Sequence, residues 1–215
     1  MTDNPTINEL TESGNFELVT TLGHSNIKEF VFGQISKRSG LTIVYMAYQL
    51  IMVLTGVLFL GYAVYIAFHG NFDMLSYSVI ALVFSFSALV ILHELMHGIA
   101  LKLTGASKIN YGGNLKKFIF YAEADMHVIN RNQFYFIALT PLVLVKIISF
   151  AGIIVFHAHP LLFFFVILMC LHSLFCAGDI GLMSFFSSHN KSDIYTFDNH
   201  SERKSYFFKR ISDRD

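Results

Sequence analysis

Charge is scarce in this chain, and that scarcity excludes several classes of protein. Charged side chains account for 14% of the 215 residues, and the formal net charge is +0. Soluble globular domains carry about 25% charged residues, so an ordinary soluble surface is excluded. The chain has no net positive charge with which to neutralise phosphates, which argues against a nucleic-acid-binding protein. Its two cysteines, Cys170 and Cys176, are too few for a disulfide-stapled secreted module, and we expect them to be small packing residues.

Apolar residues are abundant, at 54% of the chain with a mean hydropathy of +0.54, and this excludes intrinsic disorder. No basic segment leads into an apolar core near the beginning of the chain, so no cleavable signal peptide is expected. Four apolar stretches each reach the ~20 residues that a helix needs to cross a bilayer. They cover about residues 41–68, 74–104, 134–156 and 160–186. The predicted fold class is therefore an all-α membrane protein with four transmembrane helices.

The distribution of lysine and arginine predicts the orientation. Fourteen of the 15 basic residues precede the first span, follow the fourth, or flank and occupy the segment between spans two and three. The fifteenth, Lys146, lies inside span three, and the two remaining loops contain none. The positive-inside rule then places both termini and the central loop in the cytosol. We expect a multi-pass integral protein of a prokaryotic plasma membrane.

The chain divides into three parts on this pattern. Residues 1–40 form a cytosolic N-terminal segment, 41–187 a four-span membrane domain with its functional core expected in 74–187, and 188–215 a cytosolic C-terminal tail. The basic and aromatic residues of the tail are compatible with a segment resting on the inner leaflet or with a solvated tail.

A small β-hairpin is expected in the cytosolic loop between spans two and three. Tyr111–Asn114 is a turn signal, and residues 118–127 follow it as a strand. Glu123, Asp125 and His127 would share one strand face, either as solvated residues or as a second metal site. An exposed strand edge there can also pair with an unwound substrate. Proline or charge substitutions in 118–127 should then disturb pairing at this edge.

Ionisable residues inside a span cost at least ~2.5–3.5 kcal/mol at the helix centre, so each needs a reason. Three of the six lie in one pentapeptide of span two, which includes His93, Glu94 and His97; the others are Lys146, His172 and Asp179. On a helix His93 and His97 are one turn and about 40° apart, so both imidazoles can reach one zinc ion. Glu94 lies on the flank, where it can take a proton from a water at the metal. The alternative is a polar patch that pairs with neighbouring helices or lines a pore.

Asp179 is the expected third zinc ligand. His93 lies 19 residues after Met74 and Asp179 lies 19 residues after Pro160, on two spans that both run inward. Equal offsets on parallel helices give equal depth, and a carboxylate suits zinc. A salt bridge from Asp179 to a basic residue is the alternative.

These residues resemble the site-2 protease clan of intramembrane zinc metalloproteases, and within it the small zincin peptidases. The resemblance rests on His93-Glu94-Leu95-Met96-His97 in span two with Gly178-Asp179 in span four, and it covers residues 74–187. It implies zinc bound by His93, His97 and Asp179, with Glu94 as the general base. It also implies a substrate that is a protein or peptide embedded in the membrane.

The other polar residues receive ordinary interpretations. His172 lies two turns from Asp179, so it is expected to form a buried helix–helix hydrogen bond or to assist as a hydrogen-bond donor at the site. Lys146 is expected to pair between helices or to extend toward the outer interface. His24, His189 and His200 lie in polar segments and are expected to be incidental.

The sequence thus predicts a zinc-dependent intramembrane endopeptidase. The alternative is a non-catalytic zinc-containing membrane scaffold or a metal-transport protein. Transport requires polar residues that continue to the outer face, and outward of His172 spans two and four have only scattered hydroxyls.

Overall fold

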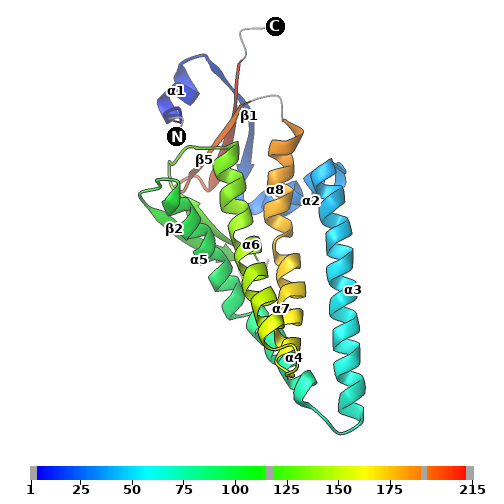
Figure 1. Ribbon diagram of the computed structural model, residues 1–215. Coiled ribbons are helices and arrows are strands. Elements are labelled where there is room, and N and C mark those ends of the chain that lie inside the picture. Colours follow the sequence, from blue (N-terminus) through cyan, green and yellow to red (C-terminus); the bar gives the residue numbers. More distant parts are fainter. Residues whose placement is uncertain (1–3, 115–118, 190–192, 212–215) are drawn as a thin grey trace.

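Residues 4–114, 119–189 and 193–211 are described by the computed structural model (Figure 1). The basic residues at 116, 117, 191 and 214 and the predicted strand start at 118 lie outside the described residues. Long helices run alongside one another, and a sheet lies at one end of them, near both termini of the chain (Figure 1).

Two helices are individually long and apolar enough to cross a membrane, and there are up to four spans if each of two bent helix pairs counts as one. The single helices are α3 (Gly40–Phe68) and α6 (Arg131–Val155), and the bent pairs are α4 (Asp73–Ser85) with α5 (Ala88–Leu103) and α7 (Leu162–Phe175) with α8 (Ala177–Ser188). These elements coincide with the four predicted apolar stretches. The coarse prediction of a mostly helical chain is confirmed, and its two to four candidate spans suggest a membrane protein.

The breaks in the second and fourth stretches were not predicted. The α4–α5 pair bends by 48° and the α7–α8 pair by 44°. At the first break the Ser87 hydroxyl donates to the Val83 carbonyl at 2.6 Å, a back-bond that competes with the helix ladder and bends helices. At the second, Cys176 separates α7 from α8, whose first turn contains Gly178. Hydropathy alone cannot reveal such breaks, because the residues on both sides are apolar.

A four-stranded antiparallel sheet joins the two ends of the chain and corrects the expectation of an all-α protein with a single hairpin. Its order is β1-β6-β5-β4, with strands β1 (Phe16–Gly23), β6 (Lys204–Arg210), β5 (Ile194–Asn199) and β4 (Ile129–Asn130). Strand β6 is the part of the tail that was interpreted as an interfacial or solvated segment. The short helices α1 (Ile7–Glu12), η1 (His24–Asn26) and α2 (Ile27–Ser36) complete the N-terminal segment.

The predicted hairpin between the second and third stretches is present. It consists of β2 (Ile109–Asn114) and β3 (Ile119–Ala124), which pair antiparallel. The expected turn at Tyr111–Asn114 is wrong, since these residues belong to β2 and pair with β3. Glycine at position 112 lets the ring of Tyr121 lie against the backbone of β2, because a Cβ there would lie 2.5 Å from that ring. Glycines that mark a turn in a sequence can equally mark a close side-chain approach within a strand.

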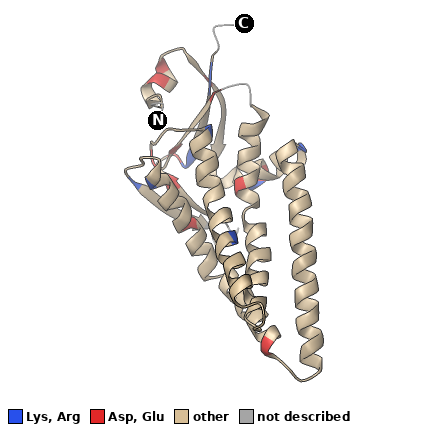
Figure 2. Ribbon diagram, viewed as in Figure 1, with Lys and Arg blue, Asp and Glu red and all other residues tan. Residues whose placement is uncertain are grey.

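The N-terminal segment is anchored to the helices by α2. A Cβ at Gly181 of α8 would lie 2.6 Å from Cγ1 of Val31, so α2 packs directly on the backbone of α8. Figure 2 shows lysine and arginine gathered at the sheet end of the molecule, with one basic residue midway along the helices. This separation of charge from a long apolar region is the arrangement expected of a membrane protein.

Candidate metal centre

Helix α5 brings His93 and His97 together. They lie one helical turn apart, and both side chains are buried. Their Nε2 atoms are 3.0 Å from each other. The spacing of four residues has therefore produced the geometry that the sequence predicted, with two imidazole nitrogens directed at one point.

Asp179 completes a group of three ligand atoms. Its Oδ2 is 3.3 Å from His93 Nε2, and its Oδ1 is 3.2 Å from His97 Nε2. Ligand atoms around a tetrahedral zinc at about 2.0–2.1 Å from the metal lie about 3.3 Å apart, so these spacings match a zinc site. Asp179 also occupies the first turn of α8, where the helix dipole favours a negative charge.

The donor set passes a second test of its fit to zinc. Oδ2 of Asp179 is buried and accepts no hydrogen bond from any described residue. A buried carboxylate oxygen without a donor is costly, and a cation among His93, His97 and Asp179 would satisfy it. These three residues form one of the two groups whose side chains can hold a metal in the described part of the chain.

A proline in α6 explains the orientation of His97. Pro141 lies inside the helix and has no backbone N–H, so the Ile137 carbonyl four residues earlier lacks its usual helical partner. That carbonyl instead accepts a hydrogen bond from His97 Nδ1 at 3.0 Å. With its proton held at Nδ1, His97 directs the lone pair of Nε2 toward His93 and Asp179. Outer partners of this kind orient metal-binding histidines.

Replacing Pro141 by Ala should weaken zinc binding by several-fold to about tenfold, because the restored N–H competes for the Ile137 carbonyl. The same change should leave the thermal stability of the zinc-free protein equal or higher, since proline disfavours a helix interior. Competition with a chelator and thermal unfolding in detergent measure the two effects. Pro160→Ala, in the α6–α7 connection, is the matched control. Unchanged zinc affinity in Pro141→Ala would contradict this role of the proline.

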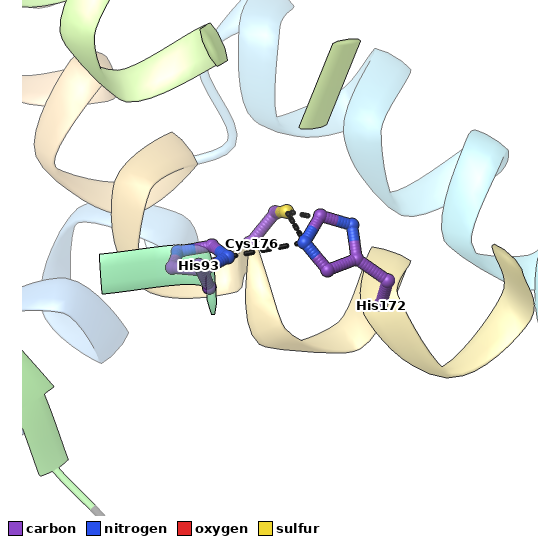
Figure 3. A group of neighbouring side chains, drawn as sticks. All are labelled: His93, His172 and Cys176. Atoms are coloured by element: carbon purple, nitrogen blue, oxygen red, sulfur yellow. Dashed lines mark hydrogen bonds between the residues drawn. The ribbon is translucent and has the colours of Figure 1, made fainter. Parts of the chain in front are cut away.

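His172 performs the corresponding task for His93. Its Nε2 lies 3.1 Å from His93 Nδ1, and its side chain is fully buried (Figure 3). The Sγ of Cys176 follows at 3.7 Å from His172 Nδ1. Because His93 Nε2 faces Asp179, the imidazole proton of His93 lies on Nδ1. This N–H donates a hydrogen bond to His172 Nε2. The expected helix–helix hydrogen bond of His172 is thus present, and it leads to the metal-binding histidine.

His93, His172 and Cys176 also form the second group that can hold a metal (Figure 3). Both groups contain His93, and a neutral imidazole has one nitrogen free to bind a metal. The two groups are therefore alternative sites for one ion. The sequence did not single out Cys176 for this position. Its four-residue spacing from His172 was the available signal, but the third member of the group, His93, comes from another helix.

Glu94 is half-buried beside the three ligand residues. Its carboxylate accepts a hydrogen bond from the backbone N–H of Ala122 in β3. A cavity of about 200 Å³ is lined by Glu94, His97 and Asp179 and extends to β3 and the four-stranded sheet. Water can therefore reach the carboxylate from the charge-rich end of the molecule.

Lys146 has partners on two other helices. Its ammonium donates to the Met169 carbonyl of α7 at 3.0 Å and lies 5.0 Å from the ring centroid of Tyr48 in α3. The expected interhelical pairing is confirmed. Cys170 and Cys176 are both buried free thiols, as predicted for packing residues.

The strand face of Glu123 is not solvated, contrary to the simpler expectation. Glu123 is only 2% exposed and contacts His24 and His200 from the two ends of the chain. Burial lowers the pKa of His24, and burial raises the pKa of nearby Asp198 to about 6. His24 and His200 are therefore not incidental, because they join the hairpin to the terminal segments. His127 instead contacts Thr104.

These features define a mostly helical protein with membrane-compatible spans and a group of two histidines and an aspartate that could hold a metal ion. A family model described as "Putative zincin peptidase" matches residues 86–194, just over half of the chain, and the chain belongs to this family. The match begins at the break before α5 and includes the hairpin, α6, α7 and α8. No curated protein and no solved structure matches the chain. Membership in the family indicates zinc-dependent peptidase activity.

Proposed function

We propose that this protein is an intramembrane zinc endopeptidase of the site-2 type, which hydrolyses a peptide bond within or beside a membrane segment. The observation that carries the proposal is the convergence of His93, His97 and Asp179 at zinc-ligand spacing beside Glu94. The centre lies on helices that belong to two bent, apolar pairs. The positive-inside rule supports both termini on the cytosolic face of a prokaryotic plasma membrane.

Different residues of the chain would bind the metal and transfer the protons of the proposed hydrolysis. His93, His97 and Asp179 would hold the zinc, which when bound supplies a Lewis acid that acidifies water and polarises the scissile carbonyl. Glu94 removes a proton from the attacking water and delivers it to the leaving amine. The Ala122 amide fixes the Glu94 carboxylate in position for both transfers.

The test uses the full-length protein purified in detergent and reconstituted into vesicles. About one zinc per chain and cleavage of membrane-segment peptides are expected, and both should be abolished by strong chelation and restored by added zinc. A scaffold would contain zinc without cleaving any peptide, and a transport protein would release zinc across the vesicle membrane.

Strand β3 is positioned to hold the substrate in an extended form. An amide that donates to Glu94 points away from β2, so the pair Tyr111–Ala122 is not hydrogen-bonded. The alternating pattern of an antiparallel ladder then places the backbone of Phe120 on the same edge and that of Gly113 on the opposite edge of the hairpin. A substrate held at the Ala122 end of this edge would lie next to Glu94.

Ala122→Pro should lower kcat/KM by about tenfold or more without loss of zinc, because it removes the N–H that donates to the Glu94 carboxylate. Gly113→Pro, which removes an N–H from the far edge of the same hairpin, should have little effect. Peptide cleavage and metal analysis on the same samples measure both quantities. Equal turnover in the two variants would refute a role for the Ala122 edge in cleavage.

A further inference from the structure

A second cavity shares Glu94 with the first. It has a volume of about 410 Å³ and is lined by His93 and Glu94, by one face of α2, and by residues at the α7–α8 break. Most of its wall is apolar, with Val31, Phe32 and Ile35 from α2 and Val90 from α5 among the lining side chains. Helix α2 precedes the family-matched segment, so this wall belongs to the chain's own N-terminal part.

Gly178 lines both cavities, as do Ile27, Glu94 and Phe120. A Cβ at Gly178 would meet nothing within 4 Å, and its backbone is outside the left-handed region. Three residues later, Gly181 is required by packing because its Cβ would clash with Val31. Neither packing nor conformation explains why Gly178 lacks a side chain. The glycine instead leaves open space beside Asp179, between the apolar cavity and the polar one.

The occupant of the apolar cavity must fit both its chemistry and its position. Its wall includes the side chains of His93 and Glu94, so a group bound there lies next to the bond that Glu94 would help to hydrolyse. A membrane segment supplies bulky apolar side chains on both sides of any peptide bond. A lipid acyl chain matches the polarity of the cavity, but it offers no reason for the open space that Gly178 leaves beside Asp179.

We propose that this cavity binds a bulky apolar side chain, leucine- or phenylalanine-sized, on the substrate residue beside the scissile bond. The inference rests on the proposed peptidase function and specifies its substrate. Helix α2 then acts as a wall that selects this residue, and α2 is held in place by its contact with Gly181. Pockets of this kind discriminate 10–200-fold between side chains that differ by methylene groups.

The experiment compares membrane-segment peptides that differ only at one position beside the cleaved bond, which carries Ala, Leu or Phe. The reconstituted wild-type protein should cleave the Leu and Phe peptides at least about tenfold faster than the Ala peptide. Val90→Phe, which narrows the cavity one turn before Glu94, should reduce this preference at least about fivefold. The matched control is Ile91→Phe, whose side chain is 63% exposed and lines neither cavity, and it should keep the wild-type preference.

Two further measurements test the cavity independently of Val90→Phe. Phe32 is 59% exposed, so Phe32→Ala enlarges the cavity with little risk to folding and should also reduce the preference. Binding of the same peptides to zinc-loaded Glu94→Gln protein should follow the same order, because binding needs no hydrolysis. Equal binding of the Ala and Phe peptides, or a uniform loss of cleavage in Val90→Phe, would overturn the cavity assignment. Ranked binding with no cleavage by the wild type would support the cavity and overturn the peptidase function.

Discussion

Glu94→Gln should lower peptide hydrolysis by at least about 10²-fold while the protein retains about one zinc per chain. General acid–base catalysis by a positioned side chain contributes typically 10²–10⁴-fold, and glutamine cannot accept the proton of the attacking water. Zinc should remain because Glu94 is absent from the three-residue group of His93, His97 and Asp179. The amide of Ala122 can still donate to the side-chain oxygen of the glutamine.

The measurement pairs metal analysis with cleavage of a membrane-segment peptide in reconstituted vesicles. Glu202→Gln is a suitable control, since Glu202 lies at the exposed β5–β6 turn and the change removes the same charge. An active Glu94→Gln protein would exclude the proposed mechanism. If the variant is inactive and zinc-loaded, it can also trap the natural substrate in native membranes for identification.

Asp179→Ala should remove most of the zinc, leaving the His93–His97 pair as a weak two-ligand site. Both carboxylate oxygens of Asp179 face the histidine Nε2 atoms at 3.2–3.3 Å, so alanine removes a ligand and opens the first coordination shell. Hydrolysis should fall with the metal content. Asp193→Ala, which removes an exposed carboxylate with 69% of its side chain accessible, should change neither quantity.

The same measurement separates the two groups that share His93. If the ion were held by His93, His172 and Cys176, then Cys176→Ser would lose zinc and Asp179→Ala would keep it. Placement of zinc with Asp179 predicts the reverse, with Cys176→Ser retaining about one zinc per chain. Zinc retained in Asp179→Ala would therefore contradict Asp179 as the third ligand. It would instead favour the group that contains Cys176.

The sequence predicted which residues would come together, because their placement depends on local periodicity. Any helix that contains His93 and His97 places the two side chains one turn apart on the same face, so their four-residue spacing alone brings them together. The equal offsets of His93 and Asp179 from the starts of their spans predicted that they would meet, and their side chains are in contact. The breaks in both spans leave this juxtaposition intact, since α5 and α8 both begin shortly before these residues.

The partners of the ligands could not be predicted in the same way. Pro141 was visible in the sequence, but its effect depends on which side chain the freed Ile137 carbonyl faces. The contact of His172 with His93 joins residues 79 positions apart. The pairing of β1 with β6 likewise joins opposite ends of the chain, and their short polar–apolar alternations carry no information about partners.

The low charge content and the long apolar stretches were sufficient to establish a helical protein with membrane-compatible spans, because hydropathy acts on each segment separately. The same local information identified His93, Glu94, His97 and Asp179 as the exceptions. Only the tertiary structure decided what surrounds them: an amide from β3, a carbonyl released by Pro141, a second histidine, and an apolar cavity walled by α2. These contacts depend on how distant segments pack, and packing is determined by the whole chain at once.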